Sequence, residues 1–144
     1  MNRKTNRALL LVLIIWLPIT MASTNIMAQP NDITYLDPYK FHFQYQAEDS
    51  ALLIDVGFER RYDKARIPSA IGIHKGRKLE TFADTVDREI PIYIYCDRES
   101  RSLTVAKYLQ YRGFREVVIL RGYIKEWKAA GLPIEGRRKP KVFW

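Results

Sequence analysis

The chain has 144 residues, with 24 lysines and arginines against 16 aspartates and glutamates, for a formal net charge of +8. This length allows one domain with a substantial core, and the sequence contains no internal repeat or low-complexity segment. The densest basic run, "GRRKPK", lacks interleaved aromatic residues that could stack on bases. We therefore expect residues 136–144 to form a solvated basic tail and exclude nucleic acid as a partner.

The first 28 residues have the layout of a secretory signal peptide. "MNRKTNR" is basic, residues 8–20 form a short apolar centre, and the small residue Ala28 precedes "QPND", with Ala22 as a second possible cleavage position. The alternative is an uncleaved membrane anchor, although a bilayer needs roughly 20 apolar residues and Pro18 interrupts this stretch. Cleavage after Ala28 removes three basic and no acidic residues, which lowers the net charge from +8 to +5. We expect an exported protein, periplasmic or secreted, that meets a membrane only if this segment is retained.

The remaining elements follow in chain order. Residues 29–49 are tyrosine-rich and less periodic, with a possible edge strand in "DITYL". From about residue 50 onward, short apolar runs alternate with segments of helical periodicity. We expect strands at 51–55, 70–73, 91–95 and 117–120, and helices at 79–87, 102–113 and 123–131. Unbroken apolar strands separated by helices predict an α/β fold with a mainly parallel central sheet and helices on both faces.

The single cysteine, Cys96, lies where the predicted strand at 91–95 ends and a helix follows. A lone cysteine in an exported chain is either an intermolecular partner or a reactive thiol, and a small apolar core residue is the third possibility. Sites in open α/β sheets lie beyond the carboxyl ends of the strands, where the N–H groups and dipole of the next helix favour a thiolate. The loop that follows can curl into a cradle of backbone N–H groups, closed by the side chain of Arg101. We expect this loop to bind an anion through Asp97, Arg98, Glu99, Ser100 and Arg101.

Three blocks, in order, resemble the rhodanese-like sulfurtransferase domain: "LIDV…IPSAIGI", "YCDRESRS" and "LRGYIKEWKAAGLPIE", all within residues 50–135. The resemblance implies a rhodanese-like fold and transfer of sulfane sulfur through a persulfide on Cys96, without a metal or organic cofactor. A small donor, thiosulfate or polysulfide, would load the cysteine. Because no second cysteine can resolve the persulfide, the acceptor would be an external thiol or cyanide. Phosphatases and arsenate reductases of similar fold have one more loop residue between cysteine and arginine, which disfavours phosphoryl chemistry here.

Two positions depart from the family pattern. Glu99 stands where the family often has glycine, and Gly57 stands where an arginine usually follows "IDV". Glu99 and Asp97 add negative charge near the thiol, which disfavours thiosulfate as the natural donor. These departures favour the alternative function, a non-catalytic module of the same fold that binds a partner or senses oxidation. His42 and His74 have no metal-ligand spacing, so we expect no metal site.

Overall fold

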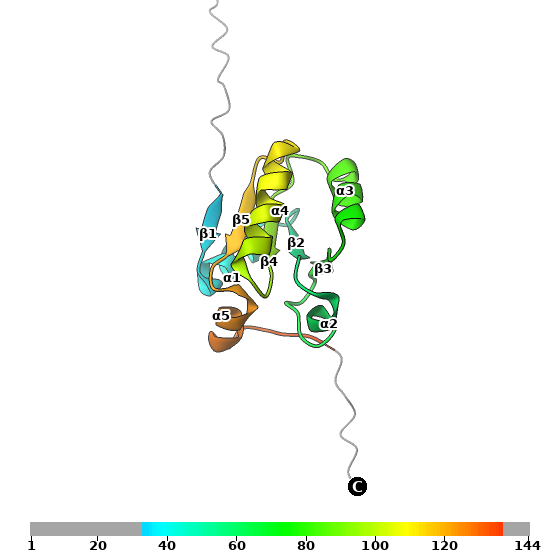
Figure 1. Cartoon of the computed structure of the whole chain (residues 1–144). Helices are drawn as coiled ribbons and strands as arrows, with labels where there is room; N and C mark the ends of the chain where they lie inside the picture. The colour runs from blue at the N-terminus through cyan, green and yellow to red at the C-terminus, as the bar shows by residue number, and fades with distance from the viewer. Residues whose placement is uncertain (1–32, 137–144) are drawn as a thin grey trace, which may run out of the picture.

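A single five-stranded sheet organises the protein, which a computed structural model describes over residues 33–136. The predicted signal peptide and the tail after Gly136 lie outside the described residues. The strand order is β1-β5-β4-β2-β3, and every pairing is parallel (Figure 1). This confirms the predicted α/β class. The strands are β1 (Thr34–Leu36), β2 (Leu52–Asp55), β3 (Ile71–Gly72), β4 (Ile92–Tyr95) and β5 (Val117–Leu120).

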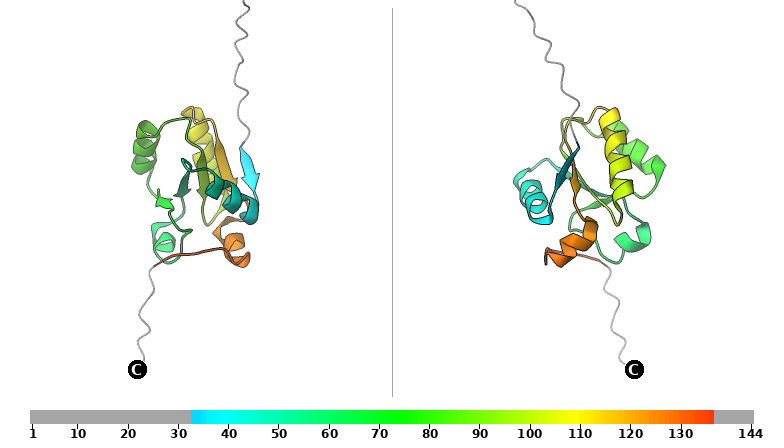
Figure 2. Two further views of the ribbon diagram at one scale, coloured as in Figure 1. Left: turned by 180° about the vertical axis from the view of Figure 1, so that it is seen from behind. Right: turned by 60° about the vertical axis from the view of Figure 1, so that its left-hand side comes forward.

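Helices cover both faces of the sheet, as predicted (Figure 2). One face packs against α3 and α4, and the other packs against α1 and α5. The short helix α2 follows β2 at the end of the sheet where α5 also lies (Figure 1). None of the helices in residues 33–136 has the length and apolar character needed to cross a membrane. The helices are α1 (Pro38–Ala47), α2 (Glu59–Tyr62), α3 (Gly76–Thr85), α4 (Glu99–Tyr111) and α5 (Tyr123–Ala129).

The central strand β4 is buried on both faces because side chains of a strand alternate between the two sides of a sheet. Ile92, Ile94 and the following Cys96 belong to the core beneath α3 and α4. Tyr93 and Tyr95 belong to the core beneath α1 and α5. Each of these five side chains is at most 1% exposed. The alternation therefore directs Cys96 toward the face that α4 covers.

The segment before residue 50 belongs to the same fold. β1 pairs with β5 at the sheet edge, which confirms the possible strand in "DITYL". The helix α1 that follows was not predicted, and it buries Phe41 against Tyr93 and Trp127. Its aromatic residues recur at every second position, which is a strand-like spacing. The sequence does carry a signal for this helix at its start, where the Asp37 side chain accepts a hydrogen bond from Lys40 N and a proline follows Asp37.

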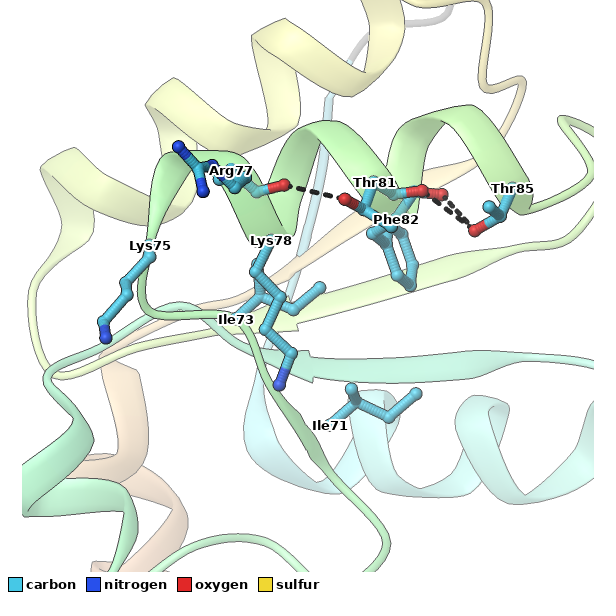
Figure 3. Close-up of a pocket in the computed structure, with 8 residues that line it drawn as sticks. All are labelled: Ile71, Ile73, Lys75, Arg77, Lys78, Thr81, Phe82 and Thr85. Atoms are coloured by element: carbon cyan, nitrogen blue, oxygen red, sulfur yellow. Dashed lines mark hydrogen bonds between the residues drawn. The ribbon is translucent and has the colours of Figure 1, made fainter.

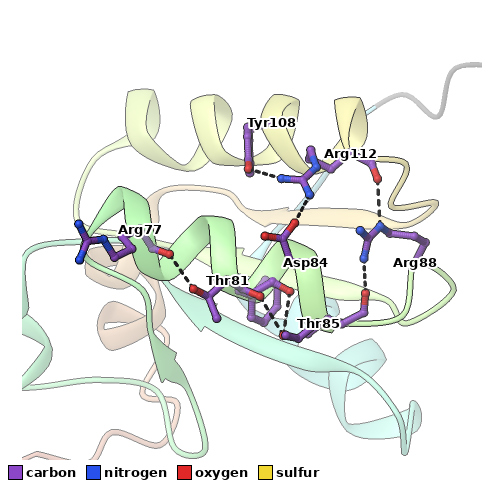
Figure 4. A network of polar contacts seen from close by, with 9 residues as sticks. Arg77, Thr81, Asp84, Thr85, Arg88, Tyr108 and Arg112 are labelled. Carbon is purple, nitrogen blue, oxygen red and sulfur yellow. Dashed lines mark hydrogen bonds and ion pairs between the residues drawn. The ribbon is translucent and has the colours of Figure 1, made fainter.

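A polar network joins the C-terminal ends of α3 and α4 (Figure 4). The guanidinium of Arg112 on α4 contacts Asp84 on α3 and donates to the hydroxyl of Tyr108 over 2.6 Å. Arg88 donates to the carbonyl of Arg112 over 3.0 Å and stacks on Phe114. α3 begins three residues before the predicted helix 79–87, and its apolar side chains Phe82 and Ala83 face the sheet. The network lies away from the start of α4, where Cys96 is found.

Candidate active site

Cys96 immediately follows β4, at the carboxyl end of the central strand, and α4 begins three residues later. Its backbone carbonyl accepts a hydrogen bond from Ile124 N of α5 over 3.1 Å. The side chain is 1% exposed. Parallel sheets place functional groups at this end of the strands because the loops there lead into helix N-termini. The structure therefore places Cys96 at the position that the sequence predicted.

The sulfur of Cys96 is surrounded by hydrogen-bonding groups of the loop and of α4. Sγ accepts from the backbone N–H of Arg98 and from the hydroxyl of Ser102, each over 3.0 Å. The thiol in turn contacts the carbonyl oxygen of Arg98. Ser102 is 2% exposed, so its hydroxyl is committed to the sulfur rather than to solvent. Two donors aimed at one sulfur stabilise negative charge on it.

The basic side chains of the loop lie over an aromatic ring rather than over the sulfur. The guanidinium of Arg101 lies 4.7 Å from the ring centroid of Phe58, and that of Arg98 lies 5.9 Å from it. Arg101 also donates to the carbonyl of His74 over 3.5 Å. Phe58 is 47% exposed, so these three side chains form an open cationic surface beside the loop. The contacts of Arg101 are with Phe58 and His74, and the hydrogen bonds to Sγ come from Arg98 N and Ser102 Oγ.

The other loop residues divide between the interior and the surface. Asp97 points inward, with its side chain 4% exposed and Oδ2 lying 2.9 Å from Nη1 of Arg61 on α2. Neither carboxylate oxygen of Asp97 has an aligned hydrogen-bond donor among the described residues. Ser100 is exposed, and Glu99 is the first residue of α4. Asp97 therefore directs its charge toward the interior.

A cavity of about 170 Å³ adjoins Cys96 at this end of the sheet. Its charged lining comes from the end of β2, from α2 and the residues after it, from the β4–α4 loop and from α5. Two acidic and three basic side chains face it, while Ala65 and Ile124 supply apolar wall. The charged residues are Asp55, Asp97, Arg61, Lys64 and Lys128. The site thus has room for a small ligand that carries charge of either sign.

Sequence reasoning missed Ser102, Arg61, Lys64 and Lys128. Ser102 lies one helical turn beyond the start of α4, and its role follows from that helix beginning earlier than predicted. Arg61 and Lys64 follow β2, a neighbour of β4 in the sheet. Because carboxyl ends of adjacent parallel strands meet at one edge, the loop after β2 was a detectable source of site residues.

Asp55 ends β2 beside this cavity and is 5% exposed. Its Oδ1 accepts from Gly57 N over 2.7 Å, and the hydroxyl of Tyr95 bonds the same carboxylate. Burial raises the pKa of Asp55, and the nearby charge of Asp97 raises it further, while these hydrogen bonds and the charge of His74 oppose the rise. Asp55 is therefore a structural carboxylate with satisfied oxygens, unlike Asp97.

Gly57 sits in contact with both carboxylates. A Cβ added at this position would lie 2.9 Å from Asp55 Oδ1 and 3.2 Å from Asp97 Oδ1. The carbonyl of Gly57 accepts from Nδ1 of His74 over 3.0 Å, which holds the loop against β3. The arginine usual after "IDV" in the resembling family would thus need Asp55 Oδ1 to shift and Asp97 Oδ1 to give way by a few tenths of an ångström.

A larger cavity of about 430 Å³ lies between β3 and α3, away from Cys96 (Figure 3). Ile71, Ile73 and Phe82 form its apolar floor, and Lys75, Arg77 and Lys78 stand around it. It shares no lining residue with the cavity beside Cys96. Because the larger cavity has no cysteine in its lining, the smaller cavity beside Cys96 is the candidate active site. Within residues 33–136, no cluster of three or more histidine, cysteine, aspartate or glutamate side chains could hold a metal ion.

Comparison with known proteins decides the family. The profile of the rhodanese-like domain matches residues 42–130, which is more than half of the chain. The chain belongs to the rhodanese-like domain family. The thiosulfate sulfurtransferase GlpE of Coxiella burnetii is 32% identical over 78 residues, which span 54% of this chain and 72% of that protein. A sulfurtransferase of Allochromatium vinosum is 28% identical over 86 residues, spanning 60% of this chain and 79% of that protein.

The rhodanese-like fold is also found in solved structures. The polysulfide-sulfur transferase homodimer of Wolinella succinogenes superposes with a TM-score of 0.65 at 23% identity, covering 77% of this chain and 84% of that one. The Alr3790 protein of Anabaena gives a TM-score of 0.65 at 22% identity, with coverages of 71% and 82%. These structures confirm the rhodanese-like fold, and the related sequences confirm the prediction of a rhodanese-type sulfurtransferase.

Proposed function

We propose that this rhodanese-like protein is an exported sulfurtransferase in which Cys96 carries sulfane sulfur as a persulfide. The donor is a small sulfur compound, thiosulfate or polysulfide, and the acceptor is an external thiol or cyanide. The observation that supports this best is the pair of donors, Arg98 N and Ser102 Oγ, each 3.0 Å from Sγ at the start of α4. Together with the helix N-terminus they favour the thiolate, which is the nucleophilic form of cysteine.

The proposed reaction has two displacement steps at sulfur. The Cys96 thiolate attacks the outer sulfur of the donor, the donor S–S bond breaks, and the remainder leaves with the electron pair, as sulfite when the donor is thiosulfate. The acceptor, a thiolate or cyanide, then attacks the outer persulfide sulfur, the persulfide S–S bond breaks, and Cys96 leaves as a thiolate. No net electrons enter or leave across the cycle. Cys96 is the only cysteine in the sequence, so the second nucleophile comes from outside the chain.

Intact-mass spectrometry of the purified protein tests the proposal. After incubation with polysulfide, and separately with thiosulfate, we expect a mass gain of one sulfur atom that reductant reverses. Cys96→Ser should show no gain with either donor. Circular dichroism would establish that this variant keeps its fold.

A second candidate is a non-catalytic redox-sensing module, favoured by Glu99 and Gly57, which depart from the family pattern. The side chain of Cys96 is 1% exposed. A buried thiol needs a local opening of the loop before a donor can reach it. If peroxide adds oxygen to Cys96 while no sulfur donor adds sulfur, the sensing function replaces the transfer function.

Export rests on the predicted signal peptide at residues 1–28. N-terminal sequencing of the mature protein should begin at Gln29, or at Ser23 if cleavage follows Ala22. Recovery of Met1 on a membrane-bound chain would show an anchor instead.

A further inference from the structure

The cavity beside Cys96 carries both signs of charge within about 170 Å³. A drug-sized ligand needs about 300 to 1,000 Å³, so this cavity suits a ligand of amino-acid size. A purely anionic ligand would match the lysines but would lie against Asp97. A zwitterion matches both halves of the lining.

We propose that the acceptor is a small thiol of the cysteine type, with an ammonium group that binds Asp97 and a carboxylate that binds Lys64 and Lys128. This inference rests on the proposed function and names the substrate class for its second step. The acceptor thiolate attacks the outer sulfur of the Cys96 persulfide, the persulfide S–S bond breaks, and the product leaves as the acceptor persulfide. The thiol proton passes to solvent before the attack.

Asp97 supplies the observation that points to an ammonium. Its side chain is 4% exposed, yet neither oxygen has an aligned hydrogen-bond donor among the described residues. Arg61 lies 2.9 Å from Oδ2 and supplies charge without such a bond. Buried carboxylate oxygens are normally hydrogen-bonded, and an ammonium brings three N–H donors. Asp55 already accepts from Gly57 and Tyr95, so Asp97 is the carboxylate left to receive a ligand.

Lys64 and Lys128 supply the opposite charge from different elements. Lys64 follows α2 and Lys128 belongs to α5, and both line the cavity. Neither forms an ion pair with a described acidic side chain. Their ammonium groups are therefore free to meet a ligand carboxylate at the mouth of the cavity. Cys96 also lines this cavity, so a zwitterion held between the two charges lies beside the residue that carries the persulfide.

Three thiols distinguish the contact of the ammonium group with Asp97 from the contact of the carboxylate with the lysines. Cysteine carries both charged groups, cysteamine lacks the carboxylate, and 3-mercaptopropionate lacks the ammonium. The protein is first loaded with polysulfide and desalted, and loss of the persulfide is then followed by intact mass. Dividing each parent rate by the variant rate for the same thiol cancels the intrinsic reactivity of that thiol.

Asp97→Asn should slow transfer to cysteine and cysteamine by at least about tenfold, and should not slow transfer to 3-mercaptopropionate. Lys128→Gln should slow cysteine and 3-mercaptopropionate but not cysteamine. Lys125→Gln is the matched control, because Lys125 is exposed on the same helix and does not line the cavity. Equal factors for all three thiols in Asp97→Asn would overturn the inference.

Calorimetric titration with L-serine, the unreactive oxygen analogue, separates this inference from the proposed function. We expect L-serine to bind the parent protein and not Asp97→Asn. If serine binds in this way while no donor loads Cys96, the site stands and the transfer function fails. If Cys96 loads but serine does not bind, the transfer function stands and the zwitterion site fails. Failure of both measurements would overturn both.

Discussion

One hydroxyl group helps to set the chemistry of the Cys96 sulfur. Ser102 Oγ is buried and donates to Sγ, while its neighbour Ser100 is exposed on the same turn of α4. A hydrogen bond to a charged group contributes about 1.5–3 kcal/mol. Ser102 therefore stabilises the thiolate through a single contact that substitution can remove.

Ser102→Ala should lower the rate of persulfide formation with polysulfide by on the order of ten- to a hundredfold. Rapid quenching followed by intact mass gives this rate. Ser100→Ala is the control, and it should load at the parent rate because Ser100 is exposed and the hydrogen bonds to the sulfur come from Arg98 N and Ser102 Oγ. A Ser102→Ala protein that loads as fast as the parent would leave Arg98 N as the relevant donor.

Asp97 has a second expected effect, on the donor step. Its inward carboxylate pairs with Arg61 and opposes an approaching dianion. Two unit charges about 7 Å apart interact by about 0.6 kcal/mol in water and about 2.4 kcal/mol at an effective dielectric of about 20, which is a lower bound for a dianion. Asp97→Asn should therefore speed loading by thiosulfate by about three- to fiftyfold, and by more in low salt than in high salt. A salt-independent rate equal to that of the parent would contradict this electrostatic role.

Among the elements, α5 connects the active-site loop to the core. Ile124 N donates to Cys96 O, and three residues later Trp127 is fully buried against Phe41. The indole Nε1 also donates to the carbonyl of Pro133 over 2.8 Å. A short helix of seven residues is held in place by such packing rather than by its own propensity.

Trp127→Ala should lower the free energy of unfolding by about 3–5 kcal/mol, measured by urea denaturation. Because α5 also supports Cys96, the loading rate should fall at urea concentrations where the variant is still folded. Lys125→Ala, on the exposed side of α5, should change the unfolding free energy by less than about 0.5 kcal/mol. A normal loading rate in Trp127→Ala would show that the loop does not depend on this helix.

The sequence predicted the elements whose side chains are buried better than those whose side chains are exposed. β2, β4 and β5 are buried apolar runs, and their positions and the fold class were predicted correctly. α1 was not, because only Phe41 of its ten residues is buried and the exposed positions carry no helical pattern. Within the site, the location of Cys96 could be predicted because this residue directly follows a predicted strand. The inward turn of Asp97 and the stacking of Arg101 on Phe58 depend on contacts between loops distant in sequence.

At the scale of the whole molecule, Asp55 links the stability of the fold to pH. Burial raises the pKa of Asp55. The folded protein therefore holds this proton more tightly than the unfolded chain, whose aspartates titrate near about 3.9. The resulting stabilisation is fully present below that value and is lost as the pH rises through the folded pKa. At neutral pH the ionised carboxylate destabilises the fold.

Asp55→Asn should be more stable than the parent at pH 7, and the difference should shrink as the pH falls toward about 4. The asparagine oxygen can still accept from Gly57 N, which preserves the turn. Urea unfolding at several pH values measures the difference in unfolding free energy between variant and parent. The contributions of the other carboxylates cancel in this difference. A difference that does not change with pH would show that Asp55 is ionised equally well in both states.

The contact of Gly57 with Asp97 has a consequence for the evolution of this protein. Because a Cβ at position 57 would stand 3.2 Å from Asp97 Oδ1, a side chain at position 57 and an inward carboxylate at position 97 compete for the same space. Orthologues should therefore change the two positions together, with lineages that regain an arginine at 57 having lost the aspartate at 97. A lineage that carries both residues would have to displace the Asp97 carboxylate from position 57.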